Sequence, residues 1–224
     1  MEITSLKHPD YQPLLDNIAE IAAQIHSYGW AEANAGNLSI DVSDIVYKHL
    51  QTQERWYIVS RTGSRYRQTA LRPGDNLLLI SCNKDKETFF PAHARPTSEW
   101  ISHRCLQMAN ARFKVILHTH PAEIIALSAL PIMQQPEAFN RMLPELLPEL
   151  PLYLPEGIAI CPYQPPGSLQ LCQSSQKVLT DQKALIWMGH GLLTFAQDLD
   201  EALDYMEIIV KAARIFFLKA NLPG

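Results

Sequence analysis

Two histidines separated by one residue stand at the end of a predicted strand. Residues 114–118 read Lys-Val-Ile-Leu-His, and this apolar run continues into Thr119, His120 and Pro121. Side chains at positions i and i+2 of a strand point to the same face of a sheet, so His118 and His120 could bind one metal ion. Taken alone, such a pair is also typical of a structural contact without a metal.

A third histidine follows another apolar strand. His190 lies between Gly189 and Gly191, directly after the predicted strand at residues 184–188. Glycines allow tight turns and close backbone approach, which would place this imidazole at the end of the strand. Three neutral imidazoles with an open fourth position are typical of a catalytic zinc site. By itself, His190 is better explained as a histidine in a hairpin turn.

Three short polar segments have the composition of anion-binding turns. They are residues 34–39 (NAGNLS), 60–65 (SRTGSR) and 95–99 (RPTSE). Each combines small hydroxyl or amide side chains with a turn or a helix start, where backbone N–H groups are free to bind an anion. Singly, each is more often an ordinary turn, and their spacing alone does not bring them together.

Glu99 lies near the start of a helix predicted over residues 97–111, with Thr97 as its N-cap. An acidic residue is favoured in the first turn by the helix dipole alone. A catalytic role for Glu99 therefore requires a metal centre close to its carboxylate.

Charge and composition narrow the class of protein. The 224 residues carry 19 Lys and Arg against 23 Asp and Glu, a formal net charge of −4, which argues against a nucleic-acid binder. The N-terminal residues lack the basic and apolar regions of a signal peptide, and no apolar run reaches the length of a membrane span. We therefore expect a cytoplasmic protein with no membrane partner, and four reduced thiols at Cys82, Cys105, Cys161 and Cys172.

Hydrophobic spacing predicts alternating helices and strands in one α/β domain over residues 1–224. The helices are predicted at 12–28, 97–111, 122–130, 168–180 and 199–220, and the strands at 38–42, 56–60, 76–82, 114–118, 184–188 and 192–196. Gly29 would end the first helix, and Asp198 with Glu201 would begin the last. Residues 131–166 contain nine prolines among apolar residues, which predicts a packed, irregular connection.

Together these motifs resemble the class II aldolase/adducin family. ANAGNLS, SRTG, PTSE, HTHP and GHGLL occur in the family's order and extend the resemblance from about residue 14 to residue 218. The resemblance implies a three-layer α/β/α fold with a central, largely antiparallel sheet. It also implies a homotetramer with active sites between subunits, and one zinc ion per subunit held by His118, His120 and His190.

The same resemblance assigns roles in the cleavage of a phosphorylated ketose. Zinc would stabilise the carbanion that retro-aldol cleavage leaves, and Glu99 would handle its proton. Glu149, in a stretch at residues 139–162 that also matches, would come from a neighbouring subunit. The phosphate would be held by Asn34, Gly36, Asn37, Thr62, Gly63, Thr97 and Ser98. Arg61 and Arg65 could add charge, and His93 is expected at the surface or behind the site.

Within the family, PTSE and residues 139–162 resemble the branch that cleaves L-rhamnulose 1-phosphate to dihydroxyacetone phosphate and L-lactaldehyde. Alternatives on the same scaffold are cleavage of L-fuculose 1-phosphate and dehydration of methylthioribulose 1-phosphate. The epimerase branch has aspartate at the position of Glu99 and matches less well. A non-catalytic adducin-like scaffold has no need to keep the three histidines and Glu99.

Overall fold

The computed structural model describes residues 2–84 and 86–220. Met1, Asp85 and residues 221–224 lie outside the described residues. The assignment of residues 1–224 to a single domain stays a prediction. None of the described helices is both long and apolar enough to cross a membrane.

A mixed sheet of eight strands forms the centre of the described structure, in the order β4-β3-β2-β1-β5-β8-β7-β6. All neighbouring strands are antiparallel except β6 and β7, which are parallel. The strands are β1 Asn37–Asp41, β2 Arg55–Ser60, β3 Leu77–Asn83, β4 Lys86–Phe90, β5 Val115–Thr119, β6 Ala159–Cys161, β7 Ala184–Trp187 and β8 Gly191–Ala196.

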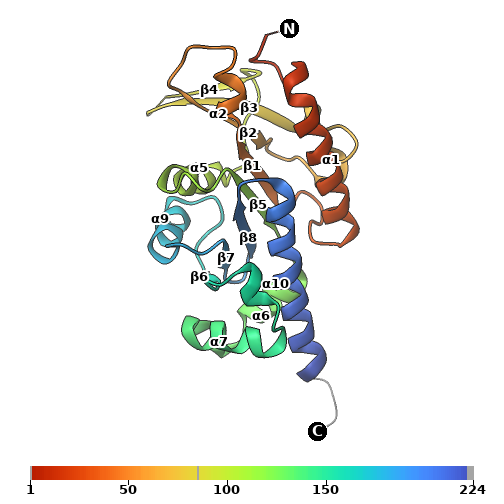
Figure 1. Ribbon diagram of the computed structural model, residues 1–224, viewed down its shortest axis with the longest axis vertical. Coiled ribbons are helices and arrows are strands. Elements are labelled where there is room, and N and C mark those ends of the chain that lie inside the picture. The colour runs from red at the N-terminus through yellow and green to blue at the C-terminus, as the bar shows by residue number, and fades with distance from the viewer. Residues whose placement is uncertain (1, 85, 221–224) are drawn as a thin grey trace.

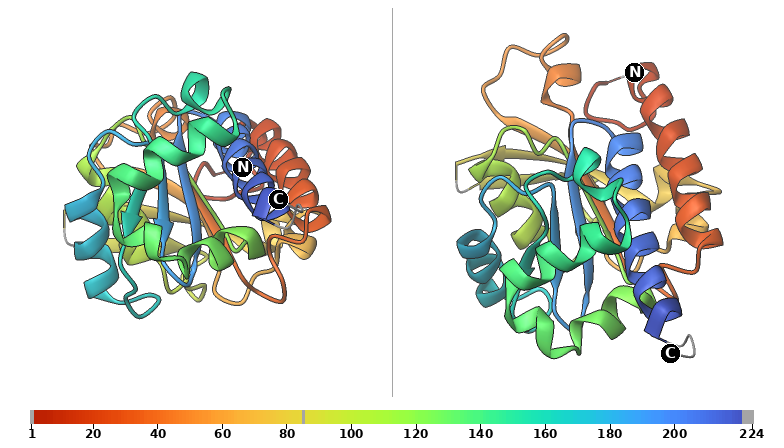
Figure 2. Two further views of the ribbon diagram at one scale, coloured as in Figure 1. Left: turned by 90° about the horizontal axis from the view of Figure 1, so that it is seen from below. Right: turned by 60° about the horizontal axis from the view of Figure 1, so that its bottom comes forward.

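Helices cover both faces of this sheet (Figure 1). α1 and α10 lie side by side on one face, and α5 and α9 pack together on the other. α6 and α7 lie at the end of the molecule opposite the N-terminus, as the two views of Figure 2 also show. The helices are η1 Pro9–Tyr11, α1 Gln12–Ser27, α2 Ser43–Val46, α3 Tyr66–Thr69, α4 Pro73–Asn76, α5 Trp100–Ala109, α6 Ala122–Ser128, η2 Pro131–Gln134, α7 Pro136–Leu146, α8 Leu150–Tyr153, α9 Leu169–Val178 and α10 Leu199–Ala220. The predicted fold class is confirmed.

The first three residues of strand β5 are all apolar, because both faces of the sheet are buried at this strand. Val115 and Leu117 pack into the core on the α1–α10 side, whereas Ile116 packs into the core beneath α5 and α9. Because helices cover both faces of the sheet, both sets of alternating side chains are buried. The strand is therefore held rigidly on both sides up to its end, where His118 lies.

The predicted boundaries of the first and last helices are confirmed. α1 ends just before Gly29, which adopts φ 72°, and α10 begins at Leu199 with Asp198 Oδ1 accepting a 2.8 Å hydrogen bond from the Glu201 amide. The second hydrogen bond of the predicted capping box, from a backbone amide to the Glu201 side chain, has a different donor. Oε2 of Glu201 accepts from the amide of Gln197, at 3.1 Å, rather than from that of Asp198.

The helix predicted to start at Thr97 begins instead at Trp100, with Glu99 as its N-cap residue. The reason is a tertiary contact: the Thr97 amide donates to the Ser60 carbonyl at 2.8 Å, and Arg61 forms a β-bridge with Pro96. Pro96 and Thr97 therefore lie alongside the end of β2, and Ser98 and Glu99 form the turn that leads into the helix.

The connection predicted to be irregular over residues 131–166 contains α7, α8 and β6, and that prediction was wrong. Pro136 and Pro151 occupy the first turns of their helices, where a missing N–H has no cost. Asn140 of α7 exchanges hydrogen bonds with the backbone of Ile158, at 2.8 and 3.0 Å, which fixes the approach to β6. The polar edge strand β4 was not predicted either.

The cysteines also differ from the prediction of four reduced thiols. Cys105 of α5 and Cys172 of α9 form a disulfide, whereas Cys82 and Cys161 are free and buried. The two helices lie against each other on one face of the sheet, so residues far apart in the sequence come within bonding distance.

Candidate active site

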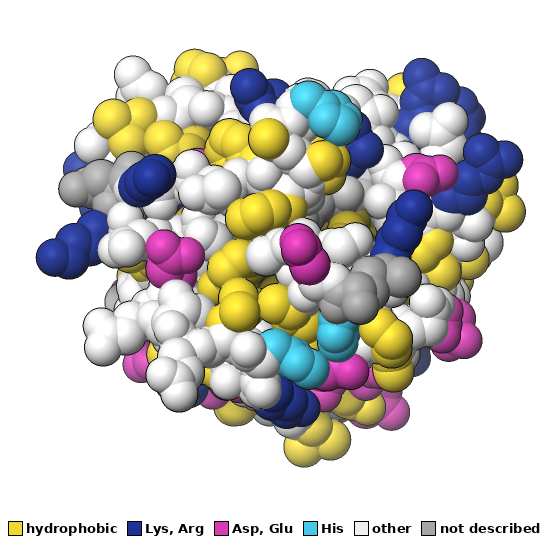
Figure 3. All heavy atoms as spheres, turned by 90° about the horizontal axis from the view of Figure 1, so that it is seen from above, with side chains coloured by type: hydrophobic (Ala, Val, Ile, Leu, Met, Phe, Trp, Pro, Cys, Tyr) yellow, Lys and Arg dark blue, Asp and Glu magenta, His cyan; other side chains and the backbone are white. Residues whose placement is uncertain are grey.

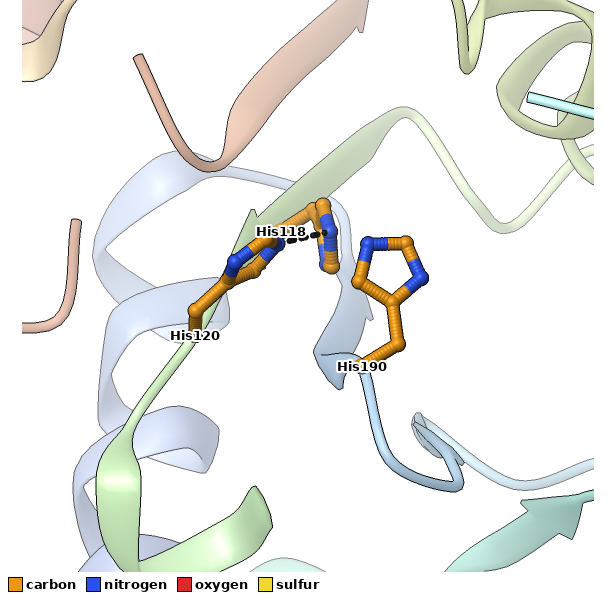
Figure 4. A group of neighbouring side chains, drawn as sticks. All are labelled: His118, His120 and His190. Carbon is orange, nitrogen blue, oxygen red and sulfur yellow. Dashed lines mark hydrogen bonds between the residues drawn. The ribbon is translucent and has the colours of Figure 1, made fainter. Parts of the chain in front are cut away.

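Three histidines converge where β5 and β8 lie side by side (Figure 4). His118 is the fourth residue of β5, His120 follows that strand, and His190 lies in the turn between β7 and β8. One ring nitrogen from each lies within 4.8 Å of the other two. The Nε2 atoms of His118 and His120 are 3.0 Å apart.

The orientation of the His118 ring is fixed by a backbone carbonyl. Its Nδ1 lies 3.0 Å from the carbonyl oxygen of Leu192. Because a carbonyl only accepts, Nδ1 carries the proton and Nε2 presents a lone pair. The ring of His190 stacks on Trp187 with centroids 5.1 Å apart. Its Nδ1 is buried and has no hydrogen-bond partner among the residues that the structure describes.

Gly191 makes the close approach of these strands possible. A Cβ at this position would lie 2.9 Å from the His120 ring and 3.0 Å from the His118 ring, and closer still to the Thr119 carbonyl oxygen. Any other residue would therefore displace the histidines. The glycine beside His190 is required by packing against the other two imidazoles.

The Glu99 carboxylate lies among the histidines. Its Oε2 is 3.3 Å from Nε2 of His118, and its Oε1 is 3.1 Å from Nε2 of His190. The side-chain amide of Asn37 donates a 2.7 Å hydrogen bond to the same Oε2. Glu99 and Asn37 are both buried. The carboxylate is thus held against the imidazoles from the side of β1.

Burial sets the charge states in this cluster. It lowers the pKa of His118 well below its ordinary value and also lowers that of His120, because burial favours the neutral form of an imidazole. Burial alone would raise the pKa of the Glu99 carboxyl. The His118 and His190 rings and the Asn37 amide outweigh burial and hold that pKa below its ordinary value.

A polar cavity of about 470 Å³ adjoins the cluster. It contains Glu99, His120 and His190, together with all seven residues predicted to bind phosphate: Asn34, Gly36, Asn37, Thr62, Gly63, Thr97 and Ser98. Two hydrogen bonds bring the three polar segments together. Ser60 Oγ accepts from the Leu38 amide at 3.0 Å, and the Arg95 carbonyl accepts from the Thr62 amide at 2.9 Å.

Other predicted residues lie elsewhere. Glu149 is exposed at the start of α8, with Lys211 Nζ 3.9 Å away, and does not line the cavity. Arg61 lines the cavity, whereas Arg65 does not, and His93 is exposed. The cavity also includes residues that the sequence did not single out for a role: Glu32, Ser64 and Pro166. Ser64 belongs to the SRTGSR segment, but no sequence signal marks Glu32 or Pro166.

The donor set fits a tetrahedral divalent metal such as zinc. Zinc–nitrogen and zinc–oxygen bonds of about 2.0–2.2 Å place neighbouring ligand atoms roughly 3.4 Å apart. Nε2 of His118 lies 3.0 Å from Nε2 of His120, and the three donor nitrogens all lie within 4.8 Å of one another. Neutral imidazoles with one nitrogen fixed by a carbonyl are the usual metal-binding form of histidine.

A largely antiparallel sheet covered on both faces, with three histidines and a carboxylate beside a polar cavity, defines an α/β protein with a candidate metal centre. The family model described as Class II Aldolase and Adducin N-terminal domain matches residues 16–217. The chain belongs to this family, as its motifs predicted.

Individual relatives agree with that assignment. The rhamnulose-1-phosphate aldolase of Bacteroides thetaiotaomicron is 26% identical over 232 residues, which are 93% of this chain and 86% of the relative. A sugar-phosphate aldolase from Thermotoga maritima has a similar structure, with a TM-score of 0.80, 24% identity and coverage of 95% and 98%. An L-fuculose-1-phosphate aldolase from Thermus thermophilus has a TM-score of 0.66 at 16% identity, with coverage of 95% and 100%. At these identities the two solved structures establish a shared fold.

Proposed function

We propose that this protein is a zinc-dependent aldehyde-lyase that cleaves L-rhamnulose 1-phosphate into dihydroxyacetone phosphate and L-lactaldehyde. The observation that carries the proposal is the position of Glu99. Its carboxylate contacts the Nε2 atoms of His118 and His190 and faces a cavity lined by small polar residues. A proton-transferring group, a metal-binding triad and an anion pocket thus share one site.

Each group has a role in retro-aldol chemistry. His118, His120 and His190 would hold the zinc ion, which when bound supplies a Lewis acid for the negative charge that develops at the substrate carbonyl. Glu99, oriented by Asn37, would take up a proton from water in the cavity and deliver it to the carbon freed by cleavage, and its ionised form would remove that proton in the reverse, condensation direction. The side chains of Glu99 and His118 are themselves buried.

The cavity suits the phosphate end of the substrate. The segments at residues 34–37, 62–63 and 97–98 contribute hydroxyl and amide side chains and glycine backbone. Neutral donors of this kind bind a phosphate without a lysine cluster. Arg61, which also lines the cavity, adds one positive charge at its edge.

Glu149 would act from a neighbouring subunit in a homotetramer. Its side chain is 63% exposed and lies outside its own subunit's cavity, so it is accessible to a second copy of the chain. In that role it would exchange a proton with the oxygen that becomes the aldehyde. We also propose that the protein is located in the cytoplasm.

The choice of sugar rests on named relatives. Rhamnulose-1-phosphate aldolases from Bacteroides thetaiotaomicron and Listeria welshimeri are each 26% identical to this chain and match it along 93% and 94% of its length. Fuculose-phosphate cleavage and methylthioribulose-phosphate dehydration would use the same metal ligands. The assay must therefore separate these reactions.

The test is cleavage by zinc-loaded protein, with dihydroxyacetone phosphate release coupled to NADH oxidation. L-rhamnulose 1-phosphate should be cleaved faster than L-fuculose 1-phosphate, and a chelator should abolish both activities. Preference for the fuculose sugar would correct the substrate and keep the reaction. If protein with bound zinc cleaves neither sugar, the aldolase proposal is overturned. Dehydration of methylthioribulose 1-phosphate would then be the reaction to test next.

A further inference from the structure

A second cluster of metal-binding side chains lies outside the candidate active site. His8, Asp10 and His49 each offer a ligand atom, and these atoms lie within 4.8 Å of one another. None of the three lines the cavity beside Glu99. In the sequence, His8 and His49 lack any context that predicts a role, and only the fold brings them together.

The backbone on both sides of the cluster is anchored. His8 precedes η1, whose last residue, Tyr11, is fully buried and donates from its hydroxyl to the Ile3 carbonyl at 3.0 Å. His49 lies just after α2, where its amide donates to the carbonyl of Val46, itself fully buried, at 2.9 Å. The positions of the three Cα atoms are therefore fixed by the core.

The Asp10 carboxylate lies between the two histidines and uses a different oxygen for each. Its Oδ2 is 2.6 Å from Nε2 of His49, and its Oδ1 is 3.8 Å from Nδ1 of His8. The two imidazole rings are 4.8 Å apart. Nδ1 of His8 also accepts a 3.3 Å hydrogen bond from the Asp10 amide as the N-cap of η1, and a bound ion would replace this hydrogen bond. These distances bracket the roughly 3.4 Å that separates neighbouring ligands of a tetrahedral zinc ion.

The side chains of the cluster are partly open to solvent. His8 is 14% exposed, Asp10 39% and His49 35%, so water can reach the site and fill open coordination positions. The hydrogen bond from His49 is the main reason that the pKa of Asp10 is lowered, and Lys48 also contributes. Figure 3 shows two adjoining histidine side chains on the face seen from above, with acidic and basic side chains beside them.

We propose that His8, Asp10 and His49 bind a second divalent transition-metal ion, for which zinc is the appropriate probe. Two imidazoles and one carboxylate are a common ligand set for such ions, with remaining positions filled by water. The ion would join the segment before α1 to the turn after α2. This inference is independent of the proposed function, because it involves none of the residues of the candidate active site.

The test is the zinc stoichiometry of the full-length, untagged protein, since a histidine tag would bind zinc itself. Metal-free protein is titrated with zinc against a colorimetric chelator. Wild type should bind two equivalents, and His49→Ala and Asp10→Asn should each bind one. His93→Ala, which changes an exposed histidine outside both clusters, should still bind two. His120→Ala should lose the other equivalent.

Thermal unfolding provides a second readout. Zinc should raise the Tm of His120→Ala, because only the folded state presents the second site, and should not do so in the double variant with His49→Ala. One equivalent in wild type, lost in His120→Ala and kept in His49→Ala, would overturn the second site while leaving the first. Two equivalents in both His49→Ala and Asp10→Asn would also overturn it.

Discussion

Asn37 and Glu99 are joined by a 2.7 Å hydrogen bond from the Asn37 amide to the Glu99 carboxylate, and both side chains are buried. The register of the sheet places Asn37 of β1 directly opposite His118 of β5. The same strand pairing that forms the sheet therefore sets the distance between the proposed proton-transferring group and a proposed metal ligand.

Replacing Asn37 tests its role in holding Glu99. Asn37→Ala should lower kcat by about 10–100-fold, the usual effect of removing a group that orients a residue at a metal site. Loss of a donor to the charged form should raise the pKa of Glu99 and move the acidic limb of the pH–rate profile upward. Asn34→Ala, in the same cavity, should instead mainly raise KM. An unchanged pH profile in Asn37→Ala would contradict the positioning role.

Glu99→Gln should keep the fold and the zinc content while losing turnover. Removing a positioned acid or base costs about 10²–10⁴-fold in rate, and three imidazoles remain to bind the metal. Steady-state kinetics and metal analysis of the same sample provide the measurement. Near-normal turnover would show that Glu99 serves only at the start of α5.

Gly191→Ala should weaken zinc binding without unfolding the protein. The added Cβ would press on the rings of His118 and His120 and on the Thr119 carbonyl, so the triad must shift. We expect at least a tenfold loss of zinc affinity and a loss of stability of about 1–3 kcal/mol. Gly74→Ala is the matched control, because nothing lies within 4 Å of its Cβ position. Equal zinc affinity in both variants would contradict the packing argument.

The buried His103 should make the protein less stable in acid. Burial lowers the pKa of His103 to about 4, whereas its ordinary value is 6.5. Between these values the unfolded state binds a proton that the folded state does not, so stability falls as the pH decreases from 6.5 to 4. The full shift corresponds to about 3 kcal/mol.

Urea unfolding of metal-free protein at pH 7.5 and pH 4 measures this effect. Wild type should lose more stability between the two values than His103→Gln, by an amount on the order of 2–3 kcal/mol. Gln keeps a polar group near Ser39, whose Oγ lies 2.9 Å from His103 Nδ1. Equal losses in the two proteins would exclude His103 as the cause.

Glu149 can be tested by mixing inactive variants. If it acts across a subunit boundary, Glu149→Ala and His120→Ala should each be inactive alone and partly active after being unfolded and refolded together. In a cyclic assembly with random mixing, roughly a quarter of the sites would hold both intact residues. Native mass spectrometry would confirm that mixed oligomers have formed. If these oligomers recover no activity, Glu149 does not act in the active site of a neighbouring subunit.

The local sequence was enough to predict the strands and helices that carry the candidate site. Apolar runs end at His118 and before Gly189, and these became β5 and β7, because such runs are buried under helices on both faces. Hydrophobic spacing also located α1 and α10. The ordered motifs identified the family before any contact was known, and the family model confirmed it.

Contacts between residues distant in the sequence set which strands and side chains become neighbours. The strand order places β1 between β2 and β5, which brings Asn37 opposite His118 and the Ser60 hydroxyl onto the Leu38 amide. The bridge between Arg61 and Pro96 holds Pro96 against the end of β2, so α5 begins only at Trp100. Local propensity cannot report such contacts, because the free energy that fixes them comes from residues distant in the chain.

For the same reason, the sequence did not predict the disulfide or the cluster of His8, Asp10 and His49. Cys105 and Cys172 carry no spacing signal, and neither do Asp10 and His49, yet packing joins each pair. Residue types and short spacings in the sequence determined which chemistry was available to the chain. The packing of helices against both faces of one sheet decided which of those residues meet, because only burial in a shared core holds distant segments together.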